Sequence, residues 1–240
     1  MAATFGDLVP GGQPVNETNC YAAAAYRGWG WPPGHRDEAE WALAVEAIHF
    51  ATAEAAVRLK QTGAPVASIF GLSTAVAHDD DPATSSIIDR FYNVHWSGGP
   101  GLFRDGVLNL PGRDRVERAD LAGSFDLIGF SYYSTASVSK GRFVPHPTDA
   151  PLSPLGYGIW ADGLGLVLDR LHEQIPGTPL LIAEYGIGTG DDEMRAAYLE
   201  RCLYIANDAR ERNPSLHDNG SSSLALRGLP RSAASSSAVR

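Results

Sequence analysis

Four short extended segments alternate with helical patterns along the chain, and this order constrains the fold more than any other feature. The clearest segment, 180–183, reads Leu-Leu-Ile-Ala without polar alternation, which is typical of a strand buried on both faces of a parallel sheet. The other extended segments are 13–16, 65–70 and 125–130, and the helical patterns are 37–61, 87–95, 158–174 and 191–209. This alternation predicts parallel α/β architecture with right-handed crossovers.

The helix expected at 37–61 has the strongest amphipathic pattern. Asp37 and Glu38 fall in its first turn, where the helix dipole favours negative charge. One apolar stripe, at steps of three and four residues, contains Trp41, Val45, Ile48, Thr52, Ala55, Ala56 and Leu59. His49 belongs to no motif, and we expect it to pack or to cap rather than to bind a metal.

Two carboxylates stand at the ends of predicted strands. Glu184 follows the apolar run 180–183, and Glu17 follows the extended segment 13–16. At the C-terminal rim of a barrel such residues point into a cavity, where a carboxylate is more often catalytic than structural. A salt-bridged Glu at a strand end explains the sequence around Glu184 equally well. Two carboxylates on different strand ends of one sheet are, however, what hydrolysis of a glycosidic bond requires.

Three motifs then narrow the interpretation. Residues 16–37 begin with Asn16-Glu17 and resemble the acid/base segment of glycoside hydrolase family 1, the β-glucosidase family. Residues 182–187, Ile-Ala-Glu-Tyr-Gly-Ile, resemble the nucleophile segment of that family. Residues 126–134 are similar to the family strand that ends in an Asn-x-Tyr pair. The motifs occur in the family's order, so the chain resembles the C-terminal half of the family's barrel, strands four to seven.

The resemblance implies a partial TIM (β/α)8 barrel of about four consecutive βα units over residues 1–209. It implies a retaining β-glycosidase in which Glu184 is the nucleophile and Glu17 is the acid/base. Asn16 would hydrogen-bond the 2-hydroxyl of the sugar, and Tyr133 would orient Glu184. The alternative for Tyr133 is a rim aromatic that packs under a loop. The substrate would be a small β-glycoside or oligosaccharide, with no cofactor and no metal.

The sequence departs from the family pattern in ways that support a second hypothesis. Thr18 stands where the family has Pro, and Ser131 stands where it has Asn, although the shorter hydroxyl is expected to keep one hydrogen bond. Half of the barrel is also missing. The alternative is therefore an inactive truncated fragment or a non-catalytic carbohydrate-binding remnant, with self-association through the open edges of the barrel. Trp29 and Trp31 either line the aglycone side or pack in a loop.

Composition excludes several other functions. The 240 residues include 28 acidic and 19 basic residues, a net charge of -9, which disfavours a nucleic-acid or anionic-membrane partner but suits a neutral sugar. The amino terminus lacks the pattern of a secretory signal, and no apolar run is long enough to span a bilayer, so we expect a cytoplasmic protein. Cys20 and Cys202 indicate no disulfide framework and are expected to be buried small hydrophobes.

Four other segments have simpler interpretations. The acidic segment 78–82 favours a helix cap over a metal site, and the glycines of 98–101 are expected to form a turn. Residues 140–157 contain several prolines and glycines and predict a loop over the barrel rim. The serine-rich segment 210–240 predicts a low-complexity, disordered tail.

Overall fold

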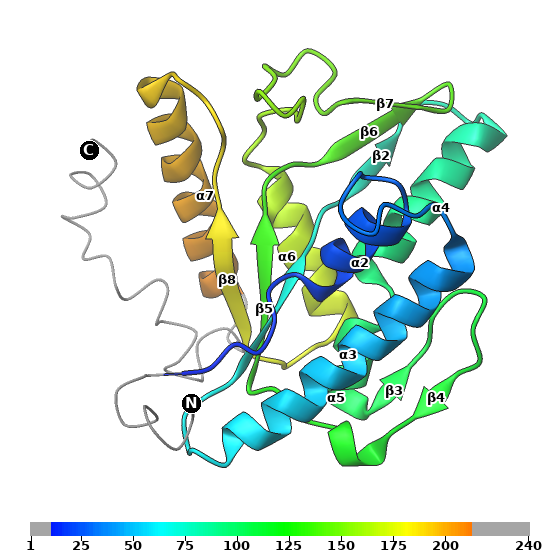
Figure 1. Ribbon diagram of the computed structural model, residues 1–240. Coiled ribbons are helices and arrows are strands. Elements are labelled where there is room, and N and C mark those ends of the chain that lie inside the picture. The colour runs from blue at the N-terminus through cyan, green and yellow to red at the C-terminus, as the bar shows by residue number, and fades with distance from the viewer. Residues whose placement is uncertain (1–10, 213–240) are drawn as a thin grey trace. The chain divides into compact units, whose positions relative to one another are not determined.

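The computed structural model describes residues 11–212, which form two compact units (Figure 1). The first unit contains residues 11–71 and 93–130, and the second contains 72–92 and 131–212. Residues 1–10 and most of the predicted tail, 213–240, lie outside the described residues. The predicted boundary at residue 209 falls inside the last helix, which continues to Arg212.

The alternating strands and helices form a partial barrel, as the sequence predicted. A parallel sheet has the strand order β1 (Ala67–Gly71), β5 (Leu127–Tyr132) and β8 (Leu180–Tyr185). Gly12 makes an isolated parallel bridge to Val66, at the position of the fourth, N-terminal strand. The helices that follow the strands are α4 (Pro82–Trp96), α6 (Gly163–Gln174) and α7 (Asp192–Arg212). β1 and β5 are completely buried, as their mostly apolar sequences favour, whereas β8 is mostly half-buried.

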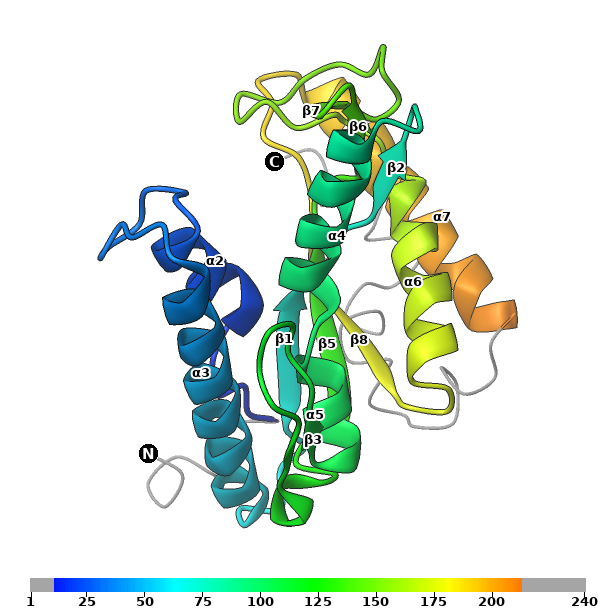
Figure 2. The ribbon, with the colours of Figure 1, turned by 90° about the vertical axis from the view of Figure 1, so that its right-hand side faces the viewer.

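Two helices follow Gly12 in the first unit and contact each other, α2 (Thr18–Tyr26) and α3 (Glu38–Lys60) (Figure 2). The predicted amphipathic helix is therefore confirmed. Asp37 is its N-cap, and its carboxylate accepts hydrogen bonds from the backbone N–H groups of Ala39 and Glu40 at 2.8 and 2.9 Å. These bonds satisfy donors that the first turn of a helix leaves without partners.

The core of the first unit is built around aromatic rings. Phe70 of β1 stacks on Phe103 with ring centroids 5.3 Å apart, and Phe103 lies 4.4 Å from Phe125. Phe103 belongs to α5 (Gly99–Asp105), a helix that begins where the sequence predicted only a turn. An added Cβ at Gly99 would lie 2.2 Å from the ring of Phe70, so close packing requires a glycine there.

A second prediction in this unit is only partly right. The sequence around residues 115–122 suggests a short helix, but the chain forms there the strand β4 (Val116–Glu117) and a single 3-10 turn, η1 (Ala119–Leu121). β4 pairs antiparallel with β3 (Val107–Leu108). Arg118 explains the break, because its N–H bonds the carbonyl of Gly106 at 2.7 Å and so ties this segment to the end of α5.

The second unit contains a small sheet that the sequence did not predict. Its order is β2 (Ala75–Ala77), β6 (Ala136–Ser139) and β7 (Arg142–Pro145), with β2 and β6 parallel and β6 and β7 antiparallel. The predicted loop at 140–157 is thus wrong in its first part.

The acidic segment beside this sheet acts as the predicted cap. Asp81 accepts a hydrogen bond from Ala83 N at 2.8 Å in the first turn of α4. Asp79 accepts from Lys140 N at 2.6 Å, which ties the segment to the turn between β6 and β7. Among residues 11–212, no group of three or more acidic, histidine or cysteine side chains is arranged to hold a metal ion.

Helices α6 and α7 contact each other in the second unit (Figure 2). α6 begins at Gly163 rather than at the predicted 158, because the preceding residues are held by an antiparallel bridge between Leu152 and Gly158. Cys202 on α7 is buried, as predicted, whereas Cys20 in the first unit is only partly buried. In the described part of the chain, no helix is long and apolar enough to cross a membrane.

Candidate active site

Glu17 occupies a special backbone position. It directly precedes α2 and adopts the left-handed conformation, with φ 46° and ψ 53°. For a residue with a side chain this conformation costs roughly 1–2 kcal/mol. Its carboxylate does not cap the helix, so helix capping does not explain this backbone conformation. Non-glycine residues in this region persist where surrounding contacts hold them, and they cluster at functional sites.

The carboxyl group of Glu17 is half-buried beside the end of β1. A Cβ added to Gly71 would lie 3.3 Å from both Cδ and Oε2 of Glu17, and 2.3 Å from Sγ of Cys20. The absence of a side chain at Gly71 therefore makes room for the two groups. Burial, and secondly the charge of Glu17, raise the pKa of the Cys20 thiol to about 12. The thiol is thus protonated at neutral pH and acts as a neutral neighbour of the carboxylate.

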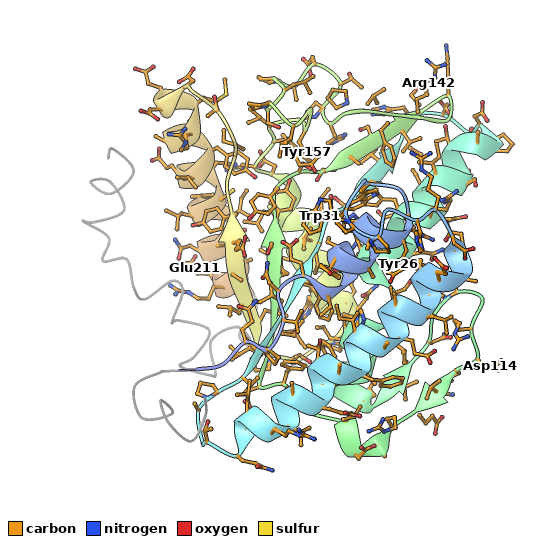
Figure 3. All side chains as sticks on the ribbon, viewed as in Figure 1. Tyr26, Trp31, Asp114, Arg142, Tyr157 and Glu211 are labelled. Atoms are coloured by element: carbon orange, nitrogen blue, oxygen red, sulfur yellow. The ribbon has the colours of Figure 1, made fainter. Side chains whose placement is uncertain are left out.

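Asn16 precedes Glu17 and is exposed. Its Oδ1 accepts a hydrogen bond from Nε2 of Gln13 at 2.9 Å. The exposed aromatic rings of this unit lie further along, in and after α2. Trp31, labelled in Figure 3, meets Tyr21 edge to face with the ring centroids 6.2 Å apart, and more than half of each side chain is exposed. Trp29 is exposed to a similar degree.

Glu184 is the fifth residue of β8 and is half-buried. The hydroxyl of Tyr133, just beyond β5, donates a hydrogen bond to Oε2 of Glu184. The hydroxyl of Tyr198 on α7 in turn donates to the backbone carbonyl of Tyr133 at 3.4 Å. A phenol that bonds one carboxylate oxygen restricts the rotation of the carboxylate and leaves the other oxygen for a substrate.

The two departures from the family pattern are both buried. Ser131 is 1% exposed, and its hydroxyl has no hydrogen-bond partner among the described residues, so none of these residues makes the bond that it is expected to keep. Thr18 is also 1% exposed, and within residues 11–212 its hydroxyl has no partner either. Ser131 is too short and too buried to replace an Asn side chain that reaches from the strand end.

The structure thus brings the predicted site residues together in two pairs. Asn16 and Glu17 adjoin each other in the first unit, and Tyr133 bonds Glu184 in the second. Each pair combines a carboxylate with a neutral side chain that can form hydrogen bonds. Glu184 lies near the end of the strand β8, and Glu17 follows the N-terminal segment that Gly12 bridges to Val66. This arrangement suits acid/base or nucleophilic chemistry on an uncharged substrate.

Comparison with known proteins identifies the fold. No family model and no curated protein matches the chain, but solved structures do. The β-glucosidase of Thermotoga maritima in complex with glucoimidazole matches with a TM-score of 0.72 and 20% identity over 87% of this chain and 53% of that chain. The GH1 β-glucosidase of Exiguobacterium antarcticum B7 matches with a TM-score of 0.73 and 18% identity, over 88% and 54%. The β-glycosidase of Thermosphaera aggregans gives 0.70 and 23%, over 87% and 46%.

These matches confirm the resemblance that the motifs indicated, at the level of the fold. The chain spans about half the length of the solved structures that it matches. Its parallel sheet and its alternating strands and helices are consistent with part of such a barrel. The chain therefore has the fold of about half of a family 1 glycoside hydrolase barrel.

Proposed function

We propose that this chain carries the catalytic pair of a retaining β-glycosidase that hydrolyses O-glycosyl bonds in carbohydrate metabolism. The hydrogen bond between Tyr133 and Glu184 supports the proposal most directly, because it holds a carboxylate at a strand end in a glycosidase fold. Glu184 is the proposed nucleophile. A sugar ring is the proposed substrate, since the Thermotoga maritima structure contains glucoimidazole.

The proposed reaction has two displacement steps. In the first, a carboxylate oxygen of Glu184 attacks the anomeric carbon while Glu17 protonates the departing glycosidic oxygen, and the bond to the leaving group breaks. In the second, Glu17 takes a proton from water, and the resulting hydroxide displaces Glu184 from the anomeric carbon. Retaining chemistry requires the two carboxyl groups to be about 5–5.5 Å apart. Asn16 is the proposed donor to the 2-hydroxyl.

The test uses two aryl β-glucosides, one with a good and one with a poor leaving group. Glu184→Gln should abolish turnover of both, because no nucleophile remains. Glu17→Gln should spare the step that releases a good leaving group, which needs no proton, and should impair the poor one. Glu200→Gln, on the exposed side of α7, is the matched control. Equal losses for both substrates in Glu17→Gln would contradict the role given to Glu17.

A non-catalytic carbohydrate-binding remnant is the second candidate. The exposed rings of Trp29 and Trp31 favour it, because they offer flat faces to a sugar. Calorimetric titration with a β-glucoside distinguishes the two candidates. Binding without turnover, weakened by Trp31→Ala, would support the remnant.

We also propose that the chain self-associates. β8 carries the apolar sequence Leu-Leu-Ile-Ala, yet most of its residues are half-buried and Ala183 is exposed. Apolar surface at the end of a sheet favours association, because contact with another chain removes it from water. Light scattering tests this, and a monomer at all accessible concentrations would refute it.

A further inference from the structure

Asn19 is a buried amide whose hydrogen bonds are all directed at the end of β1 and α4. It is 3% exposed, and its Oδ1 accepts from the backbone N–H of Gly71 at 3.0 Å. Its Nδ2 donates to the carbonyl of Gly71 at 2.8 Å and to that of Val94 at 3.2 Å. The orientation of the amide is fixed, because the N–H of Gly71 requires an acceptor and the two carbonyls require donors. One side chain thus makes both backbone bonds of a strand residue.

The carbonyl of Gly71 is held from a second side as well. Nδ1 of His95, in the last turn of α4, lies 2.8 Å from it and must be the protonated ring nitrogen, because a carbonyl only accepts. Burial lowers the pKa of His95 to about 4, so the ring is neutral at neutral pH. Asn19 and His95 together fasten α2, β1 and α4 at one residue.

Glu17 lies against this same residue. Its carboxyl carbon would be 3.3 Å from a methyl group added to Gly71, and it stands two positions before Asn19 in the chain. Its left-handed backbone is costly and needs neighbouring contacts to persist. The bonds of Asn19 supply a fixed anchor within one turn, so the position of the Glu17 carboxyl depends on them.

We propose that Asn19 is a positioning residue for Glu17. Its hydrogen bonds fasten the first turn of α2 to the backbone of Gly71 and so hold Glu17 in place. The catalytic consequence rests on the proposed function, whereas the placement of the carboxyl does not. Displacement of a catalytic group by about 1 Å can cost on the order of a hundredfold in rate. Loss of the Asn19 amide should therefore affect proton transfer by Glu17 much more than substrate binding.

The placement is tested without any enzymatic activity, with Cys20 as the reporter. Cys20 Sγ lies beside Gly71 and Glu17, and Cys202 in the same molecule is a buried internal control. Iodoacetamide alkylation of each cysteine is followed at pH 9 by peptide mass spectrometry. Glu17→Gln removes a charge that disfavours the thiolate, so the Cys20 rate should rise about threefold to tenfold.

The same substitution is then made together with Asn19→Ala and with the milder Asn19→Ser, which retains a polar group. If Asn19 holds the carboxyl of Glu17 near Cys20, Glu17→Gln should change the Cys20 alkylation rate by less than about twofold in both Asn19 variants, because the carboxyl has already moved away. The proposal would be overturned if Glu17→Gln still raised the Cys20 alkylation rate by the same factor in an Asn19 variant whose Cys202 alkylation rate stays at the wild-type value. Thr52→Ala, which removes a different buried hydrogen bond of this unit, is the control and should leave the factor unchanged.

Turnover gives the second readout. With the two aryl β-glucosides, Asn19→Ser should lower kcat for the poor leaving group by about tenfold to a hundredfold, with a smaller effect on the good one and KM within about twofold. Equal losses for both substrates would show a merely structural role and overturn the proposal. Absence of wild-type turnover would refute the proposed function, and the alkylation experiment would then decide the placement by itself.

Discussion

His49 should make the first unit sensitive to acid. Its side chain is 0% exposed and packs against the rings of both Phe70 and Phe103, with centroids 6.0 and 5.9 Å away. Nδ1 donates to the carbonyl of Val45 at 2.7 Å, and within residues 11–212 Nε2 has no hydrogen-bond partner. Protonation would therefore place a charge in an apolar stack. This burial lowers the pKa of His49 from 6.5 to about 4.

The sign and size of the effect follow from linkage. The folded state has the lower pKa, so the stability due to neutral His49 is complete above about pH 6.5 and is lost as the pH falls toward about 4. At pH 4.5 the unfolded chain is almost fully protonated at this residue and the folded chain is not, which corresponds to a loss of about 2.5 kcal/mol. This is a large fraction of the ordinary stability of a domain, about 5–15 kcal/mol. His95 adds an effect of the same sign, because burial lowers its pKa to about 4 as well.

Urea unfolding of the wild type and His49→Leu at pH 7.5 and pH 4.5 measures the effect. The fluorescence of Trp41 and Trp96, both buried in the same unit, reports the transition. The fall in the free energy of unfolding between pH 7.5 and pH 4.5 should be about 2.5 kcal/mol smaller in His49→Leu than in the wild type. Equal losses in the two proteins would refute the reasoning, because His49 would then titrate alike in the folded and unfolded chains.

Three further substitutions test the packing of the first unit by urea unfolding. Gly71→Ala should cost about 1–3 kcal/mol, because its methyl would meet Sγ of Cys20 at 2.3 Å, and an undiminished cost in a Cys20→Ala background would contradict this cause. Asp37→Ala should cost about 1 kcal/mol through loss of the helix cap, and an unchanged midpoint would show that the cap contributes nothing. Phe103→Ala should cost about 3–5 kcal/mol, since the ring is 1% exposed and contacts Phe125, and a cost below about 1 kcal/mol would contradict its place in the core.

The sequence was most informative where one local pattern determines the structure. β1 and β5 are buried on both faces because most of their residues are apolar, and the helix α3 begins where Asp37 provides a cap. Such patterns depend on neighbours within a few residues, so they are readable without the fold. The resemblance to glycosidases used the same kind of information, namely short motifs in order.

Prediction failed where distant contacts decide the outcome. The segment 140–145 contains glycine and proline and was expected to be a loop, yet Asp79 anchors the turn at Lys140 and β7 pairs with β6. At α5, Gly99 suggests a turn but is needed because the helix packs directly on Phe70. In each case the local sequence is ambiguous, and a partner tens of residues away selects one conformation.

The candidate site divides in the same way. Glu17 and Glu184 could be found from sequence because a carboxylate after a strand is unusual, and Tyr133 could be found only through the motif that contains it. Asn19 lies in the same motif, but nothing local shows that its amide bonds Gly71, 52 residues away. The groups that perform chemistry are marked by residue type, whereas those that hold them in place are marked by geometry. A search that begins at the backbone around a strained residue, as at Glu17, therefore finds supporting residues that motif comparison overlooks.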